Sequence, residues 1–297
     1  MLYENCKICG KLGRYYYEKK YSSSELLEYV KKYYGVEHIN ILKDHLKDKD
    51  FSILKCFDCN FVWQKYIPSD EFSNILYEKI IDQELSFRKS KNLEKLLKNK
   101  IRFKYNAVYK LKNKKKLNVL DFGSGWGSWL LNLDQNKANM FAFEISSTRK
   151  GYLIKNGVNV LDEQEINNYD NFFDYIRLEQ VLEHIPDIKK CMELIKKISN
   201  KNVLLEVGVP DGLKVIKDPK FITINKGPIQ PLEHLNCFSN QSLKKFIKLY
   251  DFEPYTFKDI LNLYLNKSIL SLIGFKTFLK EIFDNFFSTT IKFRIKL

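Results

Sequence analysis

The segment from 117 to 131 constrains the fold more than any other part of the sequence. An apolar run, Leu117–Phe122, leads directly into glycines at positions 123, 125 and 127. The next residues, 128–131, have the composition of a helix start. A short apolar strand that enters a glycine-rich turn and then a helix is the opening unit of a doubly wound α/β fold.

Further apolar runs continue this pattern toward the C-terminus. They cover 140–143, 158–161, 173–176 and 202–207, and polar or helical stretches separate them. Alternating strands and helices predict a parallel sheet with helices on both faces. Residues 289–297 alternate in polarity and are predicted to form a last strand, antiparallel to 255–260. The fold class is therefore predicted as α/β, with a Rossmann-like sheet of seven strands in a domain spanning 117–297.

The glycine loop differs from two well-known phosphate-binding loops. Nicotinamide-binding proteins need a third glycine at the position that Ser128 occupies here. A phosphate-binding P-loop would need a Gly-Lys-Ser/Thr sequence, which does not follow the strand. Asp121, two residues before the first glycine, suits a ligand that carries an amino group. Glu144, at the end of the second strand, is placed to accept hydrogen bonds from two ribose hydroxyls.

Four of the six cysteines form two C-x-x-C pairs, Cys6 with Cys9 and Cys56 with Cys59. Two such pairs supply the four thiolates of a tetrahedral, structural zinc site. A thioredoxin-like redox site would account for one pair only. The chain shows no secretory or membrane-spanning pattern, so we expect a cytoplasmic protein with reduced thiols. The sequence predicts a zinc-binding module over 1–69 that contains a helical run over 22–34.

Residues 70–116 read as a helical connector with a strong positive charge. Thirteen basic residues and a single acid, Glu94, lie between 88 and 116. A solvated helix face explains this charge, and so does a rim that attracts a phosphorylated substrate. The net charge of +14 also suggests nucleic acid as a partner, but only 6 of the 50 basic residues are arginines. Because arginine provides most bidentate base contacts, a nucleic-acid partner is not favoured.

Residues 268–287 are predicted to form an amphipathic helix. Its apolar face includes Phe275, Phe278 and Leu279, and its polar face includes Glu281 and Asp284. Such a helix packs on its own domain or on a second copy in a homodimer, or it lies on a membrane surface as a peripheral contact. The sequence leaves these alternatives open.

Three motifs resemble those of one enzyme family. The sequence 119–127, VLDFGSGWG, resembles motif I of class I S-adenosylmethionine-dependent methyltransferases. The sequence 173–184, FDYIRLEQVLEH, resembles their fourth-strand motif, and 233–239, EHLNCFS, resembles a later segment of the same group. The chain is most similar to a bacterial subset that carries two C-x-x-C pairs and is associated with sugars and secondary metabolites.

The resemblance implies S-adenosylmethionine as the cofactor and assigns residues to its parts. The glycine loop would line the methionine portion, Asp121 would hold the amino group and Glu144 the ribose. Ile145 would pack on the adenine, and Asp162 or Glu163 would reach its amino group. The loop residues concerned are Gly123, Ser124, Gly125 and Gly127.

The base that removes a proton from the acceptor is sought among His184, Glu183, His234 and Glu233, because neutral histidine suits proton removal near pH 7. Similar sugar C-methyltransferases use a tyrosine where this chain has Pro231, which favours methylation on oxygen. The predicted acceptor is a small hydroxylated molecule, a sugar on a nucleotide or in a surface polysaccharide. The alternatives are a ribosomal or transfer RNA methyltransferase with a zinc module and a non-catalytic protein that binds the cofactor or a partner.

Overall fold

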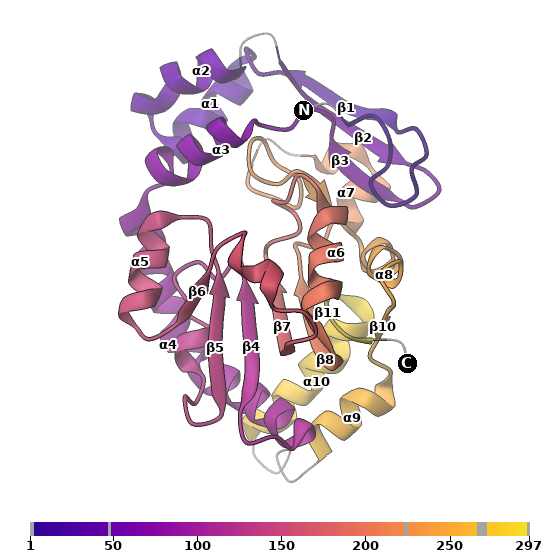
Figure 1. The fold of residues 1–297 in the computed structure, drawn as a ribbon. Helices are drawn as coiled ribbons and strands as arrows, with labels where there is room; N and C mark the ends of the chain where they lie inside the picture. Colours follow the sequence, from indigo (N-terminus) through magenta and orange to yellow (C-terminus); the bar gives the residue numbers. More distant parts are fainter. Residues whose placement is uncertain (1–2, 47–48, 223–224, 266–271, 296–297) are drawn as a thin grey trace. The chain divides into compact units, whose positions relative to one another are not determined.

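The computed structural model describes the chain except for residues 1–2, 47–48, 223–224, 266–271 and 296–297 (Figure 1). The chain divides into two compact units. The first comprises 1–83, 182–189 and 209–246, and the second comprises 84–181, 190–208 and 247–297. The domain boundaries expected from composition, after residues 69 and 116, stay a prediction.

The second unit is built on a seven-stranded sheet in the order β10-β11-β8-β7-β4-β5-β6. The strands β4 to β8 pair in parallel, and β11 is antiparallel to both of its neighbours. This confirms the predicted Rossmann-like α/β fold with an antiparallel last strand. The strand bounds are β4 (Leu117–Phe122), β5 (Ala138–Phe143), β6 (Asn159–Leu161), β7 (Phe173–Glu179), β8 (Ser199–Gly208), β10 (Phe252–Pro254) and β11 (Thr290–Ile295).

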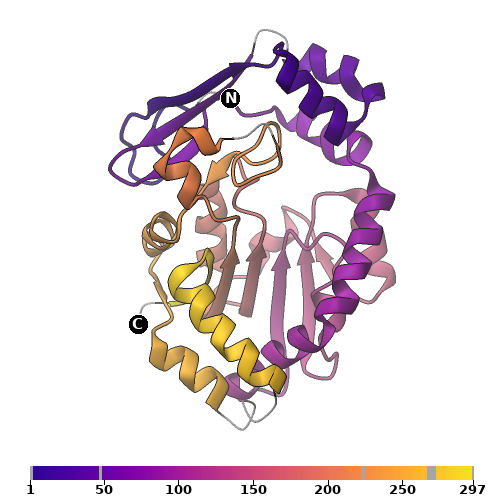
Figure 2. The same cartoon turned by 180° about the vertical axis from the view of Figure 1, so that it is seen from behind.

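Helices cover both faces of this sheet, which explains why its central strands β4 and β7 are mostly buried. Figure 2 shows α4, α9 and α10 in front of the strands, and Figure 1 shows α6 on the opposite face. Tyr105 and Val108 of α4 pack with Val119 and Tyr175 of the sheet in one core. The helix bounds are α4 (Gln83–Lys112), α5 (Ser147–Lys155), α6 (Ile188–Ile198), α9 (Phe257–Leu265) and α10 (Leu272–Phe287), with short helices η3 (Leu130–Asn132) and η4 (Glu165–Asn168).

The prediction that a helix begins at Ser128 is wrong. Only the 3₁₀ turn η3 follows the glycine loop. The Asn132 side chain donates a hydrogen bond to the Ser128 carbonyl. The Leu133 N–H donates to the Leu130 carbonyl, and this bond ends the turn. Asp134 then accepts the Asn136 N–H in the turn that leads into β5. The loop is therefore held by short turns, where a helix was expected.

The prediction of a strand over 255–260 is also wrong. The strand β10 ends at Pro254, and α9 begins at Phe257. Thr256 and Asp259 form a reciprocal cap: the Asp259 N–H donates to Thr256 Oγ1 at 3.2 Å, and the Thr256 N–H donates to Asp259 Oδ2 at 2.8 Å. Such a capping box starts a helix, and sequence periodicity alone did not detect it.

A helix is present over Leu272–Phe287, but its orientation differs from the prediction; residues 268–271 lie outside the described part. Glu281 and Asp284 are 2% and 7% exposed, whereas Phe275, Leu279 and Phe283 are 49–58% exposed. Glu281 is buried because it forms ion pairs with two lysines, Lys104 and Lys292. The apolar face is thus partly turned to solvent, and its contact with a membrane or a second copy stays a prediction.

The first unit contains a four-stranded antiparallel sheet in the order β1-β2-β3-β9. Its last strand comes from the distant segment Asn236–Cys237, which pairs with β3. The helix predicted over 22–34 is present as α1, and Ser23 caps it by accepting the Leu26 N–H. The bounds are β1 (Arg14–Lys20), α1 (Ser24–Tyr34), η1 (Val36–His38), α2 (Ile39–Leu46), β2 (Asp50–Cys56), β3 (Phe61–Gln64), α3 (Asp70–Ile75), η2 (Leu76–Ile80), α7 (Leu213–Lys217), η5 (Pro219–Phe221), β9 (Asn236–Cys237) and α8 (Asn240–Lys248).

The helical connector is confirmed in outline and is interrupted in detail. The helix α3 continues into a π-helical turn, η2. Two non-helical residues, Ile81 and Asp82, then separate this turn from α4. Among the described helices, none is both long and apolar enough to cross a bilayer.

Candidate functional site

The glycine loop follows β4 and uses backbone angles that favour glycine. Gly123, Gly125 and Gly127 have φ values of 72°, 56° and 69°. A Cβ atom at Gly123 would lie 2.7 Å from Val181 Cγ2, so only glycine fits there. At Gly125, a Cβ atom would meet nothing within 4 Å. The first glycine is therefore required for packing, and the middle one faces open space next to the backbone.

Glu144 closes this loop against the end of β5. One of its oxygens accepts the Gly125 N–H at 2.8 Å, and the other accepts the N–H groups of Ile145 and Ser146 at 2.9 and 3.0 Å. The residue is 5% exposed. The structure thus brings the predicted glycine loop into contact with Glu144, which lies 19 residues after Gly125 in the sequence. A carboxylate held this way keeps acceptor capacity for ligand hydroxyls.

Asp121 is buried beside an arginine that the sequence analysis missed. Arg177 of β7 donates to Asp121 Oδ1 at 3.2 Å, and it also lies 3.7 Å from a Glu179 oxygen and 3.9 Å from a Glu206 oxygen. Burial raises the pKa of Asp121 to about 6, although the Arg177 charge acts in the opposite direction. The arginine in the middle of the predicted strand, FDYIRLE, was the available signal.

Asp121 and Arg177 both line a cavity of about 240 Å³ in the second unit. Ser124 also lines it, and its hydroxyl has no hydrogen-bond partner among the described residues. A buried hydroxyl without a partner is costly unless a ligand satisfies it. Acidic, basic and hydroxyl groups in one cavity fit a zwitterionic ligand, such as the amino-acid end of S-adenosylmethionine.

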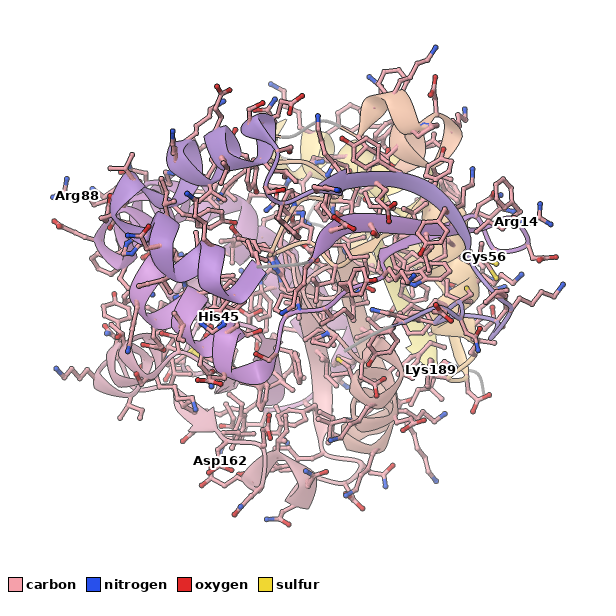
Figure 3. All side chains as sticks on the ribbon, turned by 90° about the horizontal axis from the view of Figure 1, so that it is seen from above. Arg14, His45, Cys56, Arg88, Asp162 and Lys189 are labelled. Atoms are coloured by element: carbon pink, nitrogen blue, oxygen red, sulfur yellow. The ribbon has the colours of Figure 1, made fainter. Side chains whose placement is uncertain are left out.

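The remaining predicted cofactor residues lie near the ends of β5 and β6. Ile145 is 55% exposed and so presents an apolar side chain to the surface. Asp162 is exposed, as Figure 3 shows, and its carboxylate accepts the N–H groups of Gln164 and Glu165. Glu163 is exposed as well. Asp162 has a clear local role in capping the turn that follows β6.

The four cysteines of the two C-x-x-C pairs come together in the first unit. Their sulfur atoms all lie within 4.8 Å of one another, and Cys9 Sγ lies 3.6 Å from Cys56 Sγ (Cys56 is labelled in Figure 3). Four thiolates about 2.3 Å from a zinc ion would lie about 3.8 Å apart, which agrees with this spacing. The Ile8 N–H points at Cys6 Sγ, and Gly10 and Asn60 have positive φ, as the tight turns require. The cluster is compatible with a structural zinc site.

A second cluster in the same unit contains two of the predicted catalytic histidines. The ring centroids of His184 and His234 are 4.7 Å apart, and the rings are nearly perpendicular, at 89°. The Glu183 carboxylate, which is fully buried, belongs to the same cluster. His234 Nδ1 lies 2.6 Å from the Gly227 carbonyl, and burial lowers the pKa of this histidine. Residues 50 positions apart in the sequence thus form one polar site.

Asn236 holds this cluster together from within the protein core. Its amide donates to the carbonyls of Leu182 and Ile185 at 2.9 and 2.7 Å. Its oxygen accepts from Lys7 Nζ at 2.7 Å, and Lys7 also donates to the Pro186 carbonyl at 3.0 Å. Because Lys7 lies between Cys6 and Cys9, the first cysteine pair is directly connected to the segment that carries His184.

A sequence segment that includes parts of both units matches a known family. A family model described as a methyltransferase domain matches residues 89–256, which is more than half of the chain. The chain belongs to this methyltransferase family. The protein is a methyltransferase enzyme with the class I fold, in agreement with the order and direction of its strands.

The chain is also similar, at low identity, to solved structures of methyltransferases. A SAM-dependent methyltransferase from Aquifex aeolicus shares 18% identity with this methyltransferase, covers 59% of it and 91% of its own chain, and gives a TM-score of 0.41. The 1,6-didemethyltoxoflavin N1-methyltransferase of Burkholderia thailandensis shares 14% sequence identity with the chain. The match covers 68% of this chain and 88% of that enzyme, with a TM-score of 0.38. No curated protein sequence matches the chain. The assignment rests on the family match.

Glu233, the third predicted catalytic residue, is held away from a simple proton-transfer role. Its carboxylate accepts from the Tyr34 hydroxyl at 2.5 Å, and Lys226 Nζ lies 3.7 Å away.

Tyr77 was missed by the sequence analysis. Its hydroxyl lies 3.1 Å from His184 Nδ1, and it comes from the π-helical turn η2. A π-helical turn often marks a functional position, but the sequence of the connector did not reveal it.

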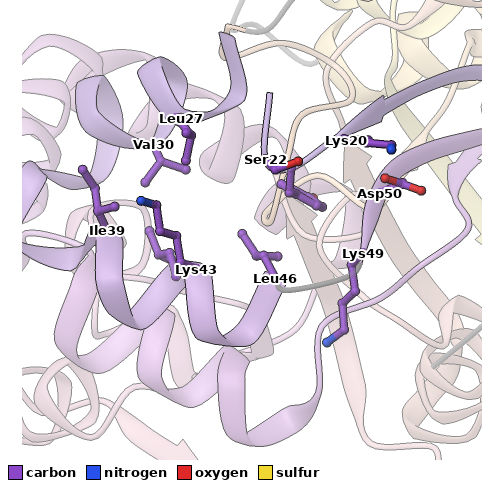
Figure 4. Close-up of a pocket in the computed structure, with 11 residues that line it drawn as sticks. Lys20, Ser22, Leu27, Val30, Ile39, Lys43, Leu46, Lys49 and Asp50 are labelled. Carbon is purple, nitrogen blue, oxygen red and sulfur yellow. The ribbon is translucent and has the colours of Figure 1, made fainter. Parts of the chain in front are cut away.

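A separate pocket of about 700 Å³ lies between the helices α1 and α2 and the end of β1 with the start of β2 (Figure 4). Apolar side chains of α1 and α2, including Leu27, Val30 and Leu46, form its walls. Lys20, Lys43 and Lys49 also line it and give it a positive charge. None of the predicted site residues lines this pocket.

Proposed function

We propose that this methyltransferase takes its methyl group from S-adenosylmethionine and transfers it to an oxygen atom of a small hydroxylated acceptor. The acceptor we propose is a sugar, carried on a nucleotide or in a growing surface polysaccharide. The observation that carries this proposal is the histidine pair of His184 and His234. The position of the tyrosine base in similar carbon methyltransferases holds Pro231 here, which supports oxygen as the acceptor atom.

The cofactor would bind at the glycine loop of the second unit. Asp121 would hold the amino group, and the unpartnered hydroxyl of Ser124 would donate to or accept from the methionine portion. Glu144 would turn its remaining acceptor capacity toward the ribose hydroxyls. Ile145 would pack on the adenine and Asp162 would contact its amino group. The glycines would allow close backbone approach at Gly123, Gly125 and Gly127.

S-adenosylmethionine supplies an electrophilic methyl group on a positively charged sulfur. His184 and His234 would bind the acceptor hydroxyl and favour the loss of its proton. Orientation contributes the rest, because holding the oxygen in line with the methyl carbon replaces a random encounter. Glu233, through its bonds to Tyr34 and Lys226, would fix the backbone next to His234.

The four cysteines would hold a structural zinc ion. Four thiolates fill the coordination sphere of zinc and leave no open position for a substrate. Through Lys7, the first pair would also stabilise the segment that contains His184. We therefore assign the metal to folding of the first unit.

Incubation with methyl-labelled S-adenosylmethionine and separate pools of nucleotide sugars, total RNA and quinone precursors tests the acceptor class. We expect label in the nucleotide-sugar pool, and loss of transfer in His234→Ala with cofactor binding retained. Label in RNA alone would support the RNA methyltransferase alternative. If no pool accepts label while the cofactor still binds, the non-catalytic alternative stands.

A further inference from the structure

We propose that Glu183, His184 and His234 form a binding site for a divalent transition-metal cation, separate from the cysteine cluster. One carboxylate oxygen and two imidazole nitrogens of these residues all lie within 4.8 Å of one another. Two imidazoles and a carboxylate are ligands for Zn²⁺, Fe²⁺, Co²⁺ or Mn²⁺, whereas Mg²⁺ and Ca²⁺ prefer oxygen ligands alone.

The hydrogen bonds of the two imidazoles prepare them as ligands. The Gly227 carbonyl can only accept a hydrogen bond, so His234 Nδ1, 2.6 Å away, carries the proton and Nε2 keeps a lone pair. The Tyr77 hydroxyl lies 3.1 Å from His184 Nδ1, and Nε2 of the same ring lies 3.9 Å from a Glu183 oxygen. Metal-binding histidines almost always bond through the second ring nitrogen to such an outer partner.

Burial and access both fit a bound cation. The Glu183 side chain is fully buried, and His184 Nε2 lies 3.9 Å from its nearer oxygen. A cation between these atoms would offset the cost of removing the carboxylate from water. The His184 side chain is 24% exposed, so an ion has a route to the cluster. Three protein ligands leave coordination positions open for water or a substrate oxygen.

The backbone around the cluster holds the ligands in place without a metal. The Glu183 carbonyl accepts the N–H groups of Leu235 and Asn236 at 2.6 and 3.1 Å, so the residue after His234 is tied to the residue before His184. Gln64 of β3 donates to the His234 carbonyl at 2.9 Å. A site built on two bonded segments loses little entropy when it takes up an ion.

The role of the cation rests on the proposed function. An acceptor hydroxyl at an open coordination position becomes more acidic, because the positive charge stabilises its oxygen anion. Its O–H bond breaks and the proton leaves to water. The oxygen then forms a bond to the methyl carbon while the carbon–sulfur bond breaks, and that electron pair stays on sulfur. In this scheme His184 and His234 act on the hydroxyl as ligands of the cation.

Titration of the zinc-loaded protein with Co²⁺, followed by calorimetry and visible absorption, tests the site directly. We expect one saturable equivalent without the sulfur charge-transfer band of the cysteine cluster. His184→Ala, His234→Ala and Glu183→Gln should abolish this binding, and Tyr77→Phe should weaken it about tenfold through the lost outer bond. His38→Ala and His45→Ala, which change the other two histidines of the chain, are the matched controls and should bind normally.

Absence of saturable binding in the wild type, or equal binding in the cluster and control variants, would overturn the proposal. Circular dichroism of each variant separates loss of a ligand from loss of folding, and Tyr77→Phe keeps all three ligands. Transfer to a hydroxylated acceptor that persists after chelation, without Co²⁺ binding, would refute the cation site and leave the proposed function standing. Co²⁺ binding without transfer to any hydroxylated acceptor would do the reverse.

Discussion

Replacing Lys7 tests whether the first cysteine pair holds the catalytic segment. Lys7 is 5% exposed, and its ammonium group donates to Asn236 Oδ1 and to the Pro186 carbonyl. In Lys7→Met the methionine fills a similar volume, while both acceptors lose a charged donor. Lys11→Met is the matched control, because Lys11 follows the same cysteine pair and its side chain forms an exposed ion pair with Asp58.

The expected cost follows from the two lost hydrogen bonds. Leaving a buried acceptor unpaired costs about 1–3 kcal/mol, and two acceptors are affected. Relief from burying the ammonium group offsets part of this, so we expect a net loss of about 2 kcal/mol in the local stability of the first unit. Each 1.4 kcal/mol corresponds to a tenfold change in an equilibrium, so opening of the segment that contains His184 should become about 30-fold more frequent.

Hydrogen–deuterium exchange over 182–187 and 234–238 measures this opening, alongside zinc content, cofactor affinity and methyl transfer. We expect faster exchange in these two segments and slower transfer in Lys7→Met, with the zinc content and the Kd for S-adenosylmethionine unchanged. Lys11→Met should match the wild type in every measurement. Unchanged exchange in Lys7→Met, or an equal effect of Lys11→Met, would refute the connection.

Three further substitutions and one pH dependence test other parts of the account. Glu144→Ala should raise the Kd for S-adenosylmethionine by about 10- to 100-fold in calorimetry, because hydrogen bonds to a charged group are lost; equal affinity would remove this residue from the site. Because burial raises the pKa of Asp121 to about 6, its charged form is lost below that pH, so the Kd should rise as the pH falls through 6 and should not do so in Asp121→Asn. Cys56→Ser should lose zinc in elemental analysis together with solubility, and a soluble, zinc-free, active variant would contradict the structural role. Lys292→Met should destabilise the second unit by about 3 kcal/mol in denaturant unfolding, because it removes one of the two lysines that pair with the buried Glu206 and Glu281; a change below about 1 kcal/mol would show that this lysine is dispensable.

The features that the sequence revealed are those set by local chemistry. The apolar run Leu117–Phe122 and its glycines predicted β4 and its loop, because a buried parallel strand and a tight turn each need those residue types. The two C-x-x-C pairs predicted a cysteine cluster for the same reason. Such features depend on neighbours in the chain, so a single sequence contains the information.

The features that the sequence concealed depend on distant segments. Asn236 and Cys237 pair with β3, which lies more than 170 residues earlier in the chain. A strand of two residues has no sequence pattern that predicts this pairing. The polar residue Glu281 of α10 is buried because it finds its lysine partners on α4 and β11. Tyr77 reaches His184 only because a π-helical turn places it there. Polar residues were expected at the surface, and specific partners overrode that expectation.

Transfer from S-adenosylmethionine carrying a carbon-13 methyl group, followed by NMR of the product, tests the central claim most directly. The account predicts a methyl signal from an O-methylated sugar with the wild type. It predicts no such signal with His234→Ala, which should still bind the cofactor with the wild-type Kd. A methyl group on nitrogen, on carbon or on RNA would contradict the proposed acceptor, and an O-methyl product formed equally by His234→Ala would contradict the proposed site.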